Sequence, residues 1–143
     1  MQVKIASSDE ELSRICPVML QLRPQYQESS LIAQFKLQQA EGYQLAYVEQ
    51  DGNVLCVAGF VMGSKLAWSK HIYVDDLVTN AQHRSTGAGK CMIDWLKQHC
   101  KNNGCQQLHL DSGVQRFAAH KFYLREGFVI NSHHFSIADL DEF

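Results

Sequence analysis

The chain of 143 residues is 45% hydrophobic and 20% charged, with a formal net charge of −2, which suits a single domain over residues 1–143 with a core of its own. This charge argues against a nucleic-acid-binding protein, which usually carries a basic surplus. The longest apolar run, Val54 to Met62, is far shorter than the roughly 20 residues of a membrane-spanning helix, and the N-terminus lacks an apolar secretion signal, so we expect neither membrane insertion nor secretion.

The first two elements are predicted to be a strand and a helix. Residues 2–7 (QVKIAS) alternate between polar and apolar side chains, as strand residues do. Ser8 and Glu11 then form a capping box, in which each side chain satisfies a backbone N–H, and apolar residues follow at helical spacing. Pro17 lies within that pattern and removes one backbone hydrogen bond, so we expect a kink or a break there.

A second helix is predicted over residues 28–42 (ESSLIAQFKLQQAEG). Ser29 or Ser30 is its expected N-cap, because a serine oxygen can accept a hydrogen bond from the first turn. Gly42 is its expected left-handed stop.

The middle of the chain is predicted to form an antiparallel sheet. Residues 43–50 and 54–62 are apolar runs on either side of Asp51-Gly52-Asn53, and an Asp-Gly pair is a strong hairpin-turn signal. Residues 71–79 (HIYVDDLVT) add a third strand after a longer loop.

The second half alternates between helices and strands. A helix is predicted from about Gly87 to Asn103, followed by a strand (106–112), a helix (116–126) and at least one final strand (128–140). The expected fold is therefore α/β (α+β), with helices flanking a mixed central sheet that is antiparallel in its first half and contains a β-α-β crossover in its second.

Five cysteines and seven histidines raise the question of disulfides and metal sites. The cysteines are odd in number and no two have CxxC spacing, so we expect neither a disulfide framework nor a zinc site, and a reducing cytoplasm is the natural setting. No HExxH motif occurs, and adjacent His133 and His134 would point to opposite faces of a strand. We therefore expect no metal.

The stretch NAQHRSTGAGK, residues 80–90, places two glycines where a helix should begin. It is not a Walker P-loop, GxxxxGK[ST], because Arg84 stands at the first glycine position and Cys91 follows the lysine. It is not a GxGxxG dinucleotide fingerprint either, because Met92 stands at the third glycine position. A third pattern, Arg/Gln-x-x-Gly-x-Gly/Ala, fits residues 84–89, whose N–H groups at a positive helix end would attract a pyrophosphate. A glycine-rich turn that binds nothing also fits this hexapeptide.

A longer region resembles the GNAT acyltransferases, the Gcn-related N-acetyltransferases. Residues 72–128 contain, in order, a strand, the R-x-x-G-x-G motif, a helix, a second strand and a helix with the motif aromatic-Tyr-x-x-x-Gly-Phe, in the segments IYVDDLVTNAQHRSTGAGKCMIDWL and AAHKFYLREGF. Residues 1–70 agree with the family only in the order of their elements. The resemblance implies the GNAT fold and acetyl-CoA-dependent acyl transfer.

The resemblance also implies a binding site for acetyl-CoA. In the family, backbone amides of the glycine turn hold the coenzyme A pyrophosphate, and the end of the preceding strand pairs its edge with the pantetheine amides. Many relatives also have a cofactor-contacting asparagine seven positions before the tyrosine, where this chain has Arg116. The implied cofactor-binding residues are Leu77, Val78 and Thr79 of the strand, Arg84, Ser85, Thr86, Gly87, Ala88, Gly89 and Lys90 of the turn, and Arg116.

Two residues are candidates for proton transfer. Tyr123 matches the family tyrosine that protonates or hydrogen-bonds the departing thiolate, and a phenol pKa of about 10 is close to a thiol pKa of about 8.5. YVDDLV resembles the acidic strand of polyamine-acetylating members, so Asp75 is the favoured base or amine-binding group, directly or through a water. Strand alternation places Asp75 and Asp76 on opposite faces unless a bulge intervenes. A packing role for Tyr123 and structural hydrogen bonds for Asp75 are the alternatives.

The acceptor pocket is less defined by the sequence. Its proposed lining residues are Asp76, Asp111 and His134, with His109 and His133 as further candidates and Arg116 able to face either the acceptor or the cofactor. Selectivity is expected to lie in the loops at 21–31 and 63–70.

The expected function is acetyl-CoA-dependent N-acetyl transfer, directly to a primary amine. The paired aspartates favour a cationic small molecule such as a polyamine or an aminoglycoside. A protein or peptide amine as acceptor, and a non-catalytic acyl-CoA-binding domain, are the alternatives. A homodimer is the habit of the family and stays open for this chain.

Overall fold

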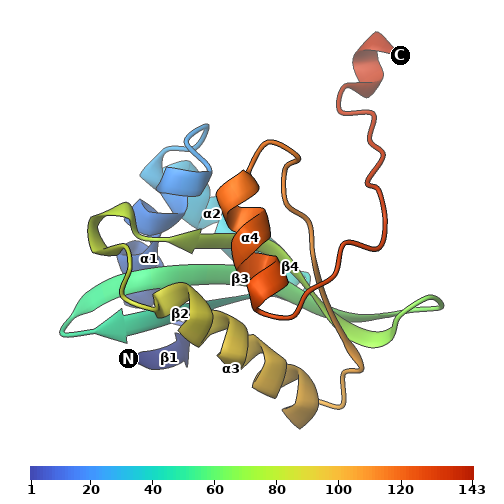
Figure 1. The fold of residues 1–143 in the computed structure, drawn as a ribbon. Coiled ribbons are helices and arrows are strands. Elements are labelled where there is room, and N and C mark those ends of the chain that lie inside the picture. Colours follow the sequence, from blue (N-terminus) through green and yellow to red (C-terminus); the bar gives the residue numbers. More distant parts are fainter. The chain divides into compact units, whose positions relative to one another are not determined.

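The computed structural model describes all residues 1–143, which form two compact units, Met1–Leu110 and Asp111–Phe143. Figure 1 shows both along the chain, from the blue N-terminus to the red C-terminus. The larger unit contains the sheet and three of the helices, and each unit is described by itself. No helix has both the length and the apolar character needed to cross a membrane.

A mixed five-stranded sheet forms the framework of the first unit, with its strands in chain order. The strands are β1 (Gln2–Ile5), β2 (Tyr43–Gln50), β3 (Asn53–Lys65), β4 (Ser69–Thr79) and β5 (Gln107–Leu110). Neighbouring strands are antiparallel except β4 and β5, which run parallel and are joined through a helix. This arrangement confirms the predicted α/β fold class, with its antiparallel first half and β-α-β crossover.

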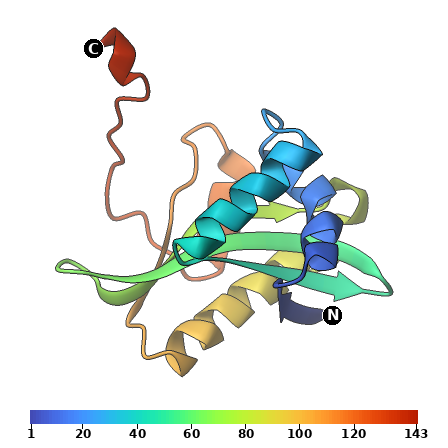
Figure 2. The same ribbon diagram turned by 180° about the vertical axis from the view of Figure 1, so that it is seen from behind.

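Helices cover both faces of this sheet, as the opposite views in Figures 1 and 2 show. They are α1 (Asp9–Leu22), α2 (Glu28–Ala40) and α3 (Ala88–Asn102). On one face, Leu45 and Tyr47 join a buried cluster with side chains of α1 and α2. On the other face, the Phe60 ring lies 6.0 Å from that of Trp95 in α3. Side chains alternate between the faces of a strand, so each strand of the middle of the sheet contributes to both layers.

The start of α1 follows its sequence signal, whereas its interior does not. The Ser8 hydroxyl accepts from the Glu11 N–H at 3.1 Å and the Glu11 carboxylate accepts from the Ser8 N–H at 3.2 Å, so the capping box is confirmed. Of the two outcomes expected at Pro17, a kink or a break, the break does not occur, because the helix continues through this residue. The proline itself is exposed, and its neighbours Cys16 and Val18 are buried. Tertiary packing on both sides therefore outweighs the loss of one backbone hydrogen bond.

Of the two predicted caps of α2, the C-terminal one is confirmed and the N-terminal one is wrong. The helix begins at Glu28 with Gln27 as its N-cap, so the prediction of Ser29 or Ser30 at that position is wrong. Ser30 acts instead from inside the first turn, where its hydroxyl accepts from the Gln27 N–H at 3.0 Å. Gly42 follows the helix with a φ of 104°, the left-handed conformation expected of a stop.

The predicted hairpin between β2 and β3 is confirmed. Asp51 and Gly52 have φ values of 53° and 78°, and a two-residue turn with positive φ at both positions matches the twist of the flanking strands. The turn sets Gln50 opposite Asn53, and a register shift between the pairs Glu49–Val54 and Val48–Cys56 then places Tyr43 opposite Val61.

The Tyr43 ring lies across β3 on the face of α1 and α2. A β-carbon added to Gly59 would lie 1.6 Å from the Tyr43 hydroxyl oxygen, so this crossing requires a glycine. The same hydroxyl donates to the carboxylate of Asp76 in β4 at 2.6 Å. Tyr43 thus links the second, third and fourth strands of the sheet.

The second unit contains α4 (Phe117–Arg125) and a short 3-10 turn, η2 (Leu140–Glu142). The predicted final strand over 128–140 is wrong, because residues 128–139 form no strand. Apolar side chains there, among them Val129, Ile130 and Phe135, are exposed. A strand needs a hydrogen-bonded partner, and this unit contains no other strand.

We expect Gly59→Ala to destabilise the protein by about 1–3 kcal/mol, because the added methyl group must displace the Tyr43 ring. Urea unfolding followed by circular dichroism measures the change. Gly63→Ala is the matched control on the same strand, because its β-carbon would meet no atom closer than 3.9 Å. Equal stability of the two variants would contradict the crowding at Gly59.

The free energy of unfolding should fall in acid partly through Glu11. The hydrogen bond from the Tyr47 hydroxyl, followed by the one from the Ser7 N–H, lowers the pKa of Glu11 to about 2. Because the folded pKa lies below the unfolded value, this stabilisation is present above the unfolded pKa and is lost as the pH falls towards 2. Glu11→Gln should therefore lose less stability than the wild type between about pH 5 and pH 2.5 in urea unfolding. Identical losses would contradict this role.

Candidate active site

The centre of β4 carries a bulge at the paired aspartates. Asp76 pairs with Gly59 and Val74 pairs with Phe60, so Asp75 is an extra residue without a partner on β3. Strand alternation alone predicts opposite faces for Asp75 and Asp76, with a bulge as the stated exception, and the structure has that exception. Burial of the Tyr43 hydroxyl, followed by the negative charge of Asp76 and its hydrogen bond and then by the charge of Asp75, raises the pKa of Tyr43. The bulge thus interrupts the regular alternation of the strand at the aspartate pair.

Asp76 is held by donors on both of its carboxylate oxygens. Arg23 donates to Oδ1 through Nε at 2.9 Å and through Nη2 at 2.8 Å, and Tyr43 donates to Oδ2 at 2.6 Å. The Asp76 side chain is only 15% exposed. A charged hydrogen bond from arginine compensates the desolvation of a carboxylate, so Asp76 is placed as a structural anion.

Asp75 has a different environment from its neighbour. Its residue is exposed, while its backbone carbonyl accepts from Arg23 Nη2 at 3.2 Å. Partial burial of the carboxyl and then the negative charge of Asp76 raise the pKa of Asp75, and Arg23 opposes them. A carboxylate with a raised pKa is a stronger base, and an exposed one can reach a substrate.

A pocket of about 130 Å³ opens beside these residues on the face of α1 and α2. Its polar lining includes Arg23, Gln25, Tyr26, Gln34, Gln38 and Asp76. Amide, phenol and charged groups can hydrogen-bond a polar molecule, so this pocket can hold a small polar group near the aspartates.

The glycine-containing turn lies between β4 and α3. Ser85 and Gly87 have φ values of 62° and 84°, and Gly87 is the N-cap of α3 without a side-chain cap hydrogen bond. Arg84 to Gly87 are exposed, whereas Ala88 is buried under the helix. Lys90 forms an ion pair with Asp94 at 3.4 Å, one turn further along. An uncapped, exposed helix start beside an arginine can accept an anion.

A short connection anchors this turn to the end of β4. The 3-10 turn η1 (Ala81–His83) begins with Asn80, whose amide nitrogen donates to the Val54 carbonyl at 2.9 Å. The Gln21 side chain of α1 accepts from the Ala81 N–H at 2.9 Å and donates to Asn80 at 3.2 Å. The start of α3 is thereby fixed relative to α1 and β3.

One edge of β4 is open where the predicted cofactor strand lies. Leu77, Val78 and Thr79 pair with β3 on one side, but β5 pairs only with the earlier residues His71–Val74. Within the sheet, the backbone groups of the last part of β4 therefore have a strand on one side only. Such an edge can hydrogen-bond an extended amide-containing chain.

The remaining predicted site residues belong to the second unit. Tyr123 lies half-buried in α4, with its ring 5.4 Å from Phe122 and 5.8 Å from Phe128. Arg116 is the N-cap residue of that helix and is exposed. Asp111 and His134 come together as an exposed ion pair of 2.9 Å, so two candidates for the acceptor pocket contact each other.

The other histidine candidates are not grouped into a site. His109 stacks on the Trp68 ring at 3.5 Å, with Lys65 4.0 Å from the centre of that ring. His133 is exposed. No group of three histidine, cysteine, aspartate or glutamate side chains is arranged to hold a metal ion.

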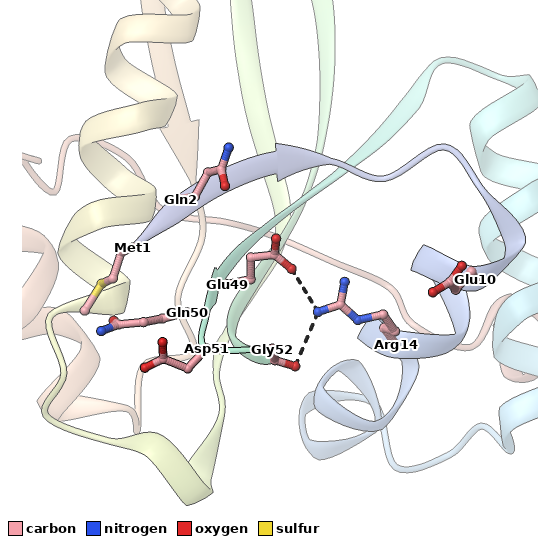
Figure 3. Close-up of a pocket in the computed structure, with 8 residues that line it drawn as sticks. All are labelled: Met1, Gln2, Glu10, Arg14, Glu49, Gln50, Asp51 and Gly52. Atoms are coloured by element: carbon pink, nitrogen blue, oxygen red, sulfur yellow. Dashed lines mark hydrogen bonds and ion pairs between the residues drawn. The ribbon is translucent and has the colours of Figure 1, made fainter.

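A second hollow of about 590 Å³ lies at the opposite end of α1 and is drawn in Figure 3. There Arg14 donates to Glu49 at 2.8 Å and to the Gly52 carbonyl at 3.5 Å, so the helix is joined to the hairpin turn. Lys4 also pairs with Glu49. The charged residues that line this hollow are Glu10, Arg14, Glu49 and Asp51, of which Arg14 and Glu49 pair with each other, and none of the predicted site residues lines it.

Sequence analysis missed Arg23 and Tyr43, which hold the aspartate pair. An aspartate in an apolar strand requires a donor or a cation, which was a signal that such partners exist. The Asp-Gly turn predicts that Tyr43 pairs within two residues of Gly59, where a large side chain can cover a glycine, but the register shift between β2 and β3 that sets its partner, Val61, has no signal in the turn. Nothing local in the sequence indicates that Arg23, 53 residues from Asp76, supplies the cation.

Comparisons with known proteins identify the family of this chain. Residues 10–128 match the family described as the acetyltransferase (GNAT) family. An uncharacterised N-acetyltransferase of Bacillus subtilis (strain 168), YhdJ, is 29% identical over 137 residues, which cover 94% of this chain and 96% of the relative.

Two solved structures show the same fold at low sequence identity. The aminoglycoside N-acetyltransferase AAC(6')-Iy in complex with CoA has a TM-score of 0.83 and 16% identity, over 97% of this chain and 95% of that one. A ribosomal-protein-alanine N-acetyltransferase from Brucella melitensis biovar Abortus 2308 has a TM-score of 0.82 and 15% identity, over 97% of this chain and all of that one. With its family match, mixed sheet and uncapped glycine turn, the chain belongs to the GNAT acetyltransferase family and is an N-acetyltransferase.

Proposed function

We propose that this enzyme uses acetyl-CoA and transfers the acetyl group directly to a primary amine of a small molecule. The observation that carries the proposal is the bulge in β4, where Asp75 is exposed and the next residue, Asp76, lines a small polar pocket. Amine chemistry needs a base at that place, because an alkylamine with a pKa of about 10.4 is protonated at neutral pH.

The residues for acetyl-CoA fit the proposal in two respects. The amides at the uncapped start of α3, with Arg84 beside them, suit a pyrophosphate, and Gly87 adopts a left-handed conformation that favours glycine. The open edge of β4 at Leu77–Thr79 suits the amides of pantetheine. When bound, acetyl-CoA supplies an activated thioester carbonyl. The related aminoglycoside enzyme was solved in complex with CoA, which supports the choice of this co-substrate.

Two residues of the chain are assigned to proton movement. Asp75 accepts a proton from the ammonium group of the acceptor, directly or through a water, so that the nitrogen lone pair is available. Tyr123 donates its hydroxyl proton or a hydrogen bond to the sulfur that departs. Of the two alternatives raised for these residues, structural hydrogen bonding suits Asp76 better than Asp75, because both Asp76 oxygens have donors.

The acceptor is proposed to be a cationic small molecule of the polyamine or aminoglycoside kind. The carboxyl groups of Asp75 and Asp76 are adjacent in β4, and one guanidinium, that of Arg23, binds the Asp76 carboxylate and the Asp75 backbone carbonyl. Arg23 and Asp76 line the pocket. The pocket volume of about 130 Å³ suits a short chain or part of a ring rather than a whole large ligand. A protein or peptide acceptor remains the second candidate, since a relative in fold is named for acting on a ribosomal protein.

The expected cellular location, partners and further site residues are also proposals. A reducing cytoplasm agrees with five free cysteines. A single functional domain, a homodimer, no nucleic-acid or membrane partner and roles for Arg116, Asp111 and His134 near the substrates are also proposed.

Asp75→Asn should lower kcat/KM by about 10²–10⁴-fold, because the amine loses its base. Release of free thiol from acetyl-CoA, with spermidine and kanamycin as separate acceptors, measures the rate. The loss should be largest near neutral pH and smaller in alkali, where more of the amine is already deprotonated. An unchanged rate in the variant would remove Asp75 from the mechanism.

Tyr123→Phe should lower kcat by about 10²–10⁴-fold with little change in the affinity for acetyl-CoA, because the ring is kept and only the proton donor is lost. Isothermal titration with acetyl-CoA gives the affinity, and the thiol-release assay gives kcat. Phe122→Leu, at the neighbouring position of α4, is the control without a hydroxyl. Full turnover in Tyr123→Phe would contradict the assignment, and a chain that gains no thermal stability from CoA would contradict the whole proposal.

A further inference from the structure

We propose that Arg23 and Tyr43 are positioning residues that act through Asp76 to hold the bulged Asp75 in place. This inference rests on the proposed function, in which Asp75 is the base. The three side chains form one hydrogen-bonded unit, here called the aspartate clamp: Arg23, Tyr43 and Asp76.

The bulge needs support because Asp75 has no pairing partner on β3. An extra residue in a strand loses ladder hydrogen bonds and can change its direction more easily than a paired one. Arg23 supplies a replacement, since Nη2 donates to the Asp75 carbonyl at 3.2 Å while the same guanidinium holds Asp76. A single side chain therefore fixes the backbone of Asp75 and the side chain of the next residue.

The aspartate clamp is anchored in three separate elements. Arg23 is the C-cap residue of α1, and its own N–H donates to the Met19 carbonyl. Tyr43 begins β2 and is buried, with a ring that crosses the sheet only because position 59 is a glycine. Asp76 is in β4. Because helix and strands hold the donors rigidly, the orientation of the bulge is set before any substrate binds.

The clamp also gives the two aspartates different roles. Asp76 accepts on both oxygens, so its carboxylate is already engaged by Arg23 and Tyr43. Asp75 is exposed, and only its backbone carbonyl is engaged by the clamp. Asp76 is therefore the support, and Asp75 is free to act on an amine.

The charges of the clamp act on Asp75 in opposite directions. The negative charge of Asp76 raises the pKa of Asp75, and the positive charge of Arg23 lowers it, while partial burial is the largest cause of the raised value. Tyr43 is neutral at neutral pH, since its own pKa is raised. Removing the charge of Asp76 and removing the charge of Arg23 should therefore shift the pKa of Asp75 in opposite directions, which a purely structural role does not predict.

The direct test is the pKa of the Asp75 carboxyl in the full chain without ligands, followed by NMR with ¹³C-labelled aspartate and assigned with Asp75→Asn. Asp76→Asn should lower this pKa, and Arg23→Gln should raise it. Tyr43→Phe removes a neutral donor to Asp76 and should shift this pKa less than either variant that removes a charge. Melting temperatures confirm that each variant is folded.

The matched control for Tyr43→Phe is Tyr47→Phe. Tyr47 lies on the same strand and the same face, is also buried, and donates to a carboxylate, Glu11, at 2.7 Å. Both variants lose a buried tyrosine hydroxyl, but only the first lies in the clamp. With spermidine or kanamycin, whichever is acetylated faster, Tyr43→Phe should lower kcat by about 10-fold or more and shift the acid limb of the pH profile, and Tyr47→Phe should change neither.

The outcomes separate this inference from the proposed function. Shifts of equal sign in Asp76→Asn and Arg23→Gln, or equal behaviour of the two tyrosine variants, would overturn the clamp. Opposite shifts in the NMR titration, together with full activity of Asp75→Asn, would support the clamp and overturn the role of Asp75 as base. Opposite shifts that also appear in the acid limb of kcat/KM would support both.

Discussion

A carboxylate on the inner side of a strand is the constraint on which the rest of this site depends. Asp76 is 15% exposed, and a charge removed from water that far requires compensation by hydrogen bonds or an opposite charge. The chain meets this need with Arg23 from the end of α1 and Tyr43 from β2. Tyr43 reaches the Asp76 carboxylate only because Gly59 has no side chain. The residue types at these positions of β2, β3 and β4 therefore depend on one another. The contact between the end of α1 and β4 is therefore part of the fold around the aspartate pair.

The bulge in β4 also determines how the aspartate pair is placed. A regular strand would send Asp75 and Asp76 to opposite faces, and Asp76 lines the pocket beside α1 and α2. The extra residue at position 75 redirects the chain, and the second half of the strand then continues with one edge open. Beyond it, Asn80 and Gln21 fix the turn that leads to the uncapped start of α3. One irregular strand therefore supplies a carboxylate, a backbone edge and an approach to a helix terminus within about a dozen residues.

Much of the first unit could be predicted because its signals are local. The capping box at Ser8, the Asp-Gly turn and the left-handed Gly42 each depend on residues within one turn of each other, and all three are present. Where packing decides, prediction was weaker. Pro17 remains in an unbroken helix because its buried neighbours hold that helix in place, and residues 128–139 form no strand because an alternating pattern does not supply a partner. The cap of α2 was misplaced by two or three residues, since a serine can act from either side of the helix start.

By itself, the sequence determined the family, the order of the elements and the chemical groups present: two aspartates in a strand, a glycine turn before a helix and a tyrosine in the last helix. These features follow from residue patterns and spacings along the sequence. Only the tertiary structure decided which aspartate is a support and which is exposed, because that depends on a bulge and on Arg23, 53 residues from its partner Asp76. The strength of such an interaction depends on distance in space, and separation along the chain does not reveal it.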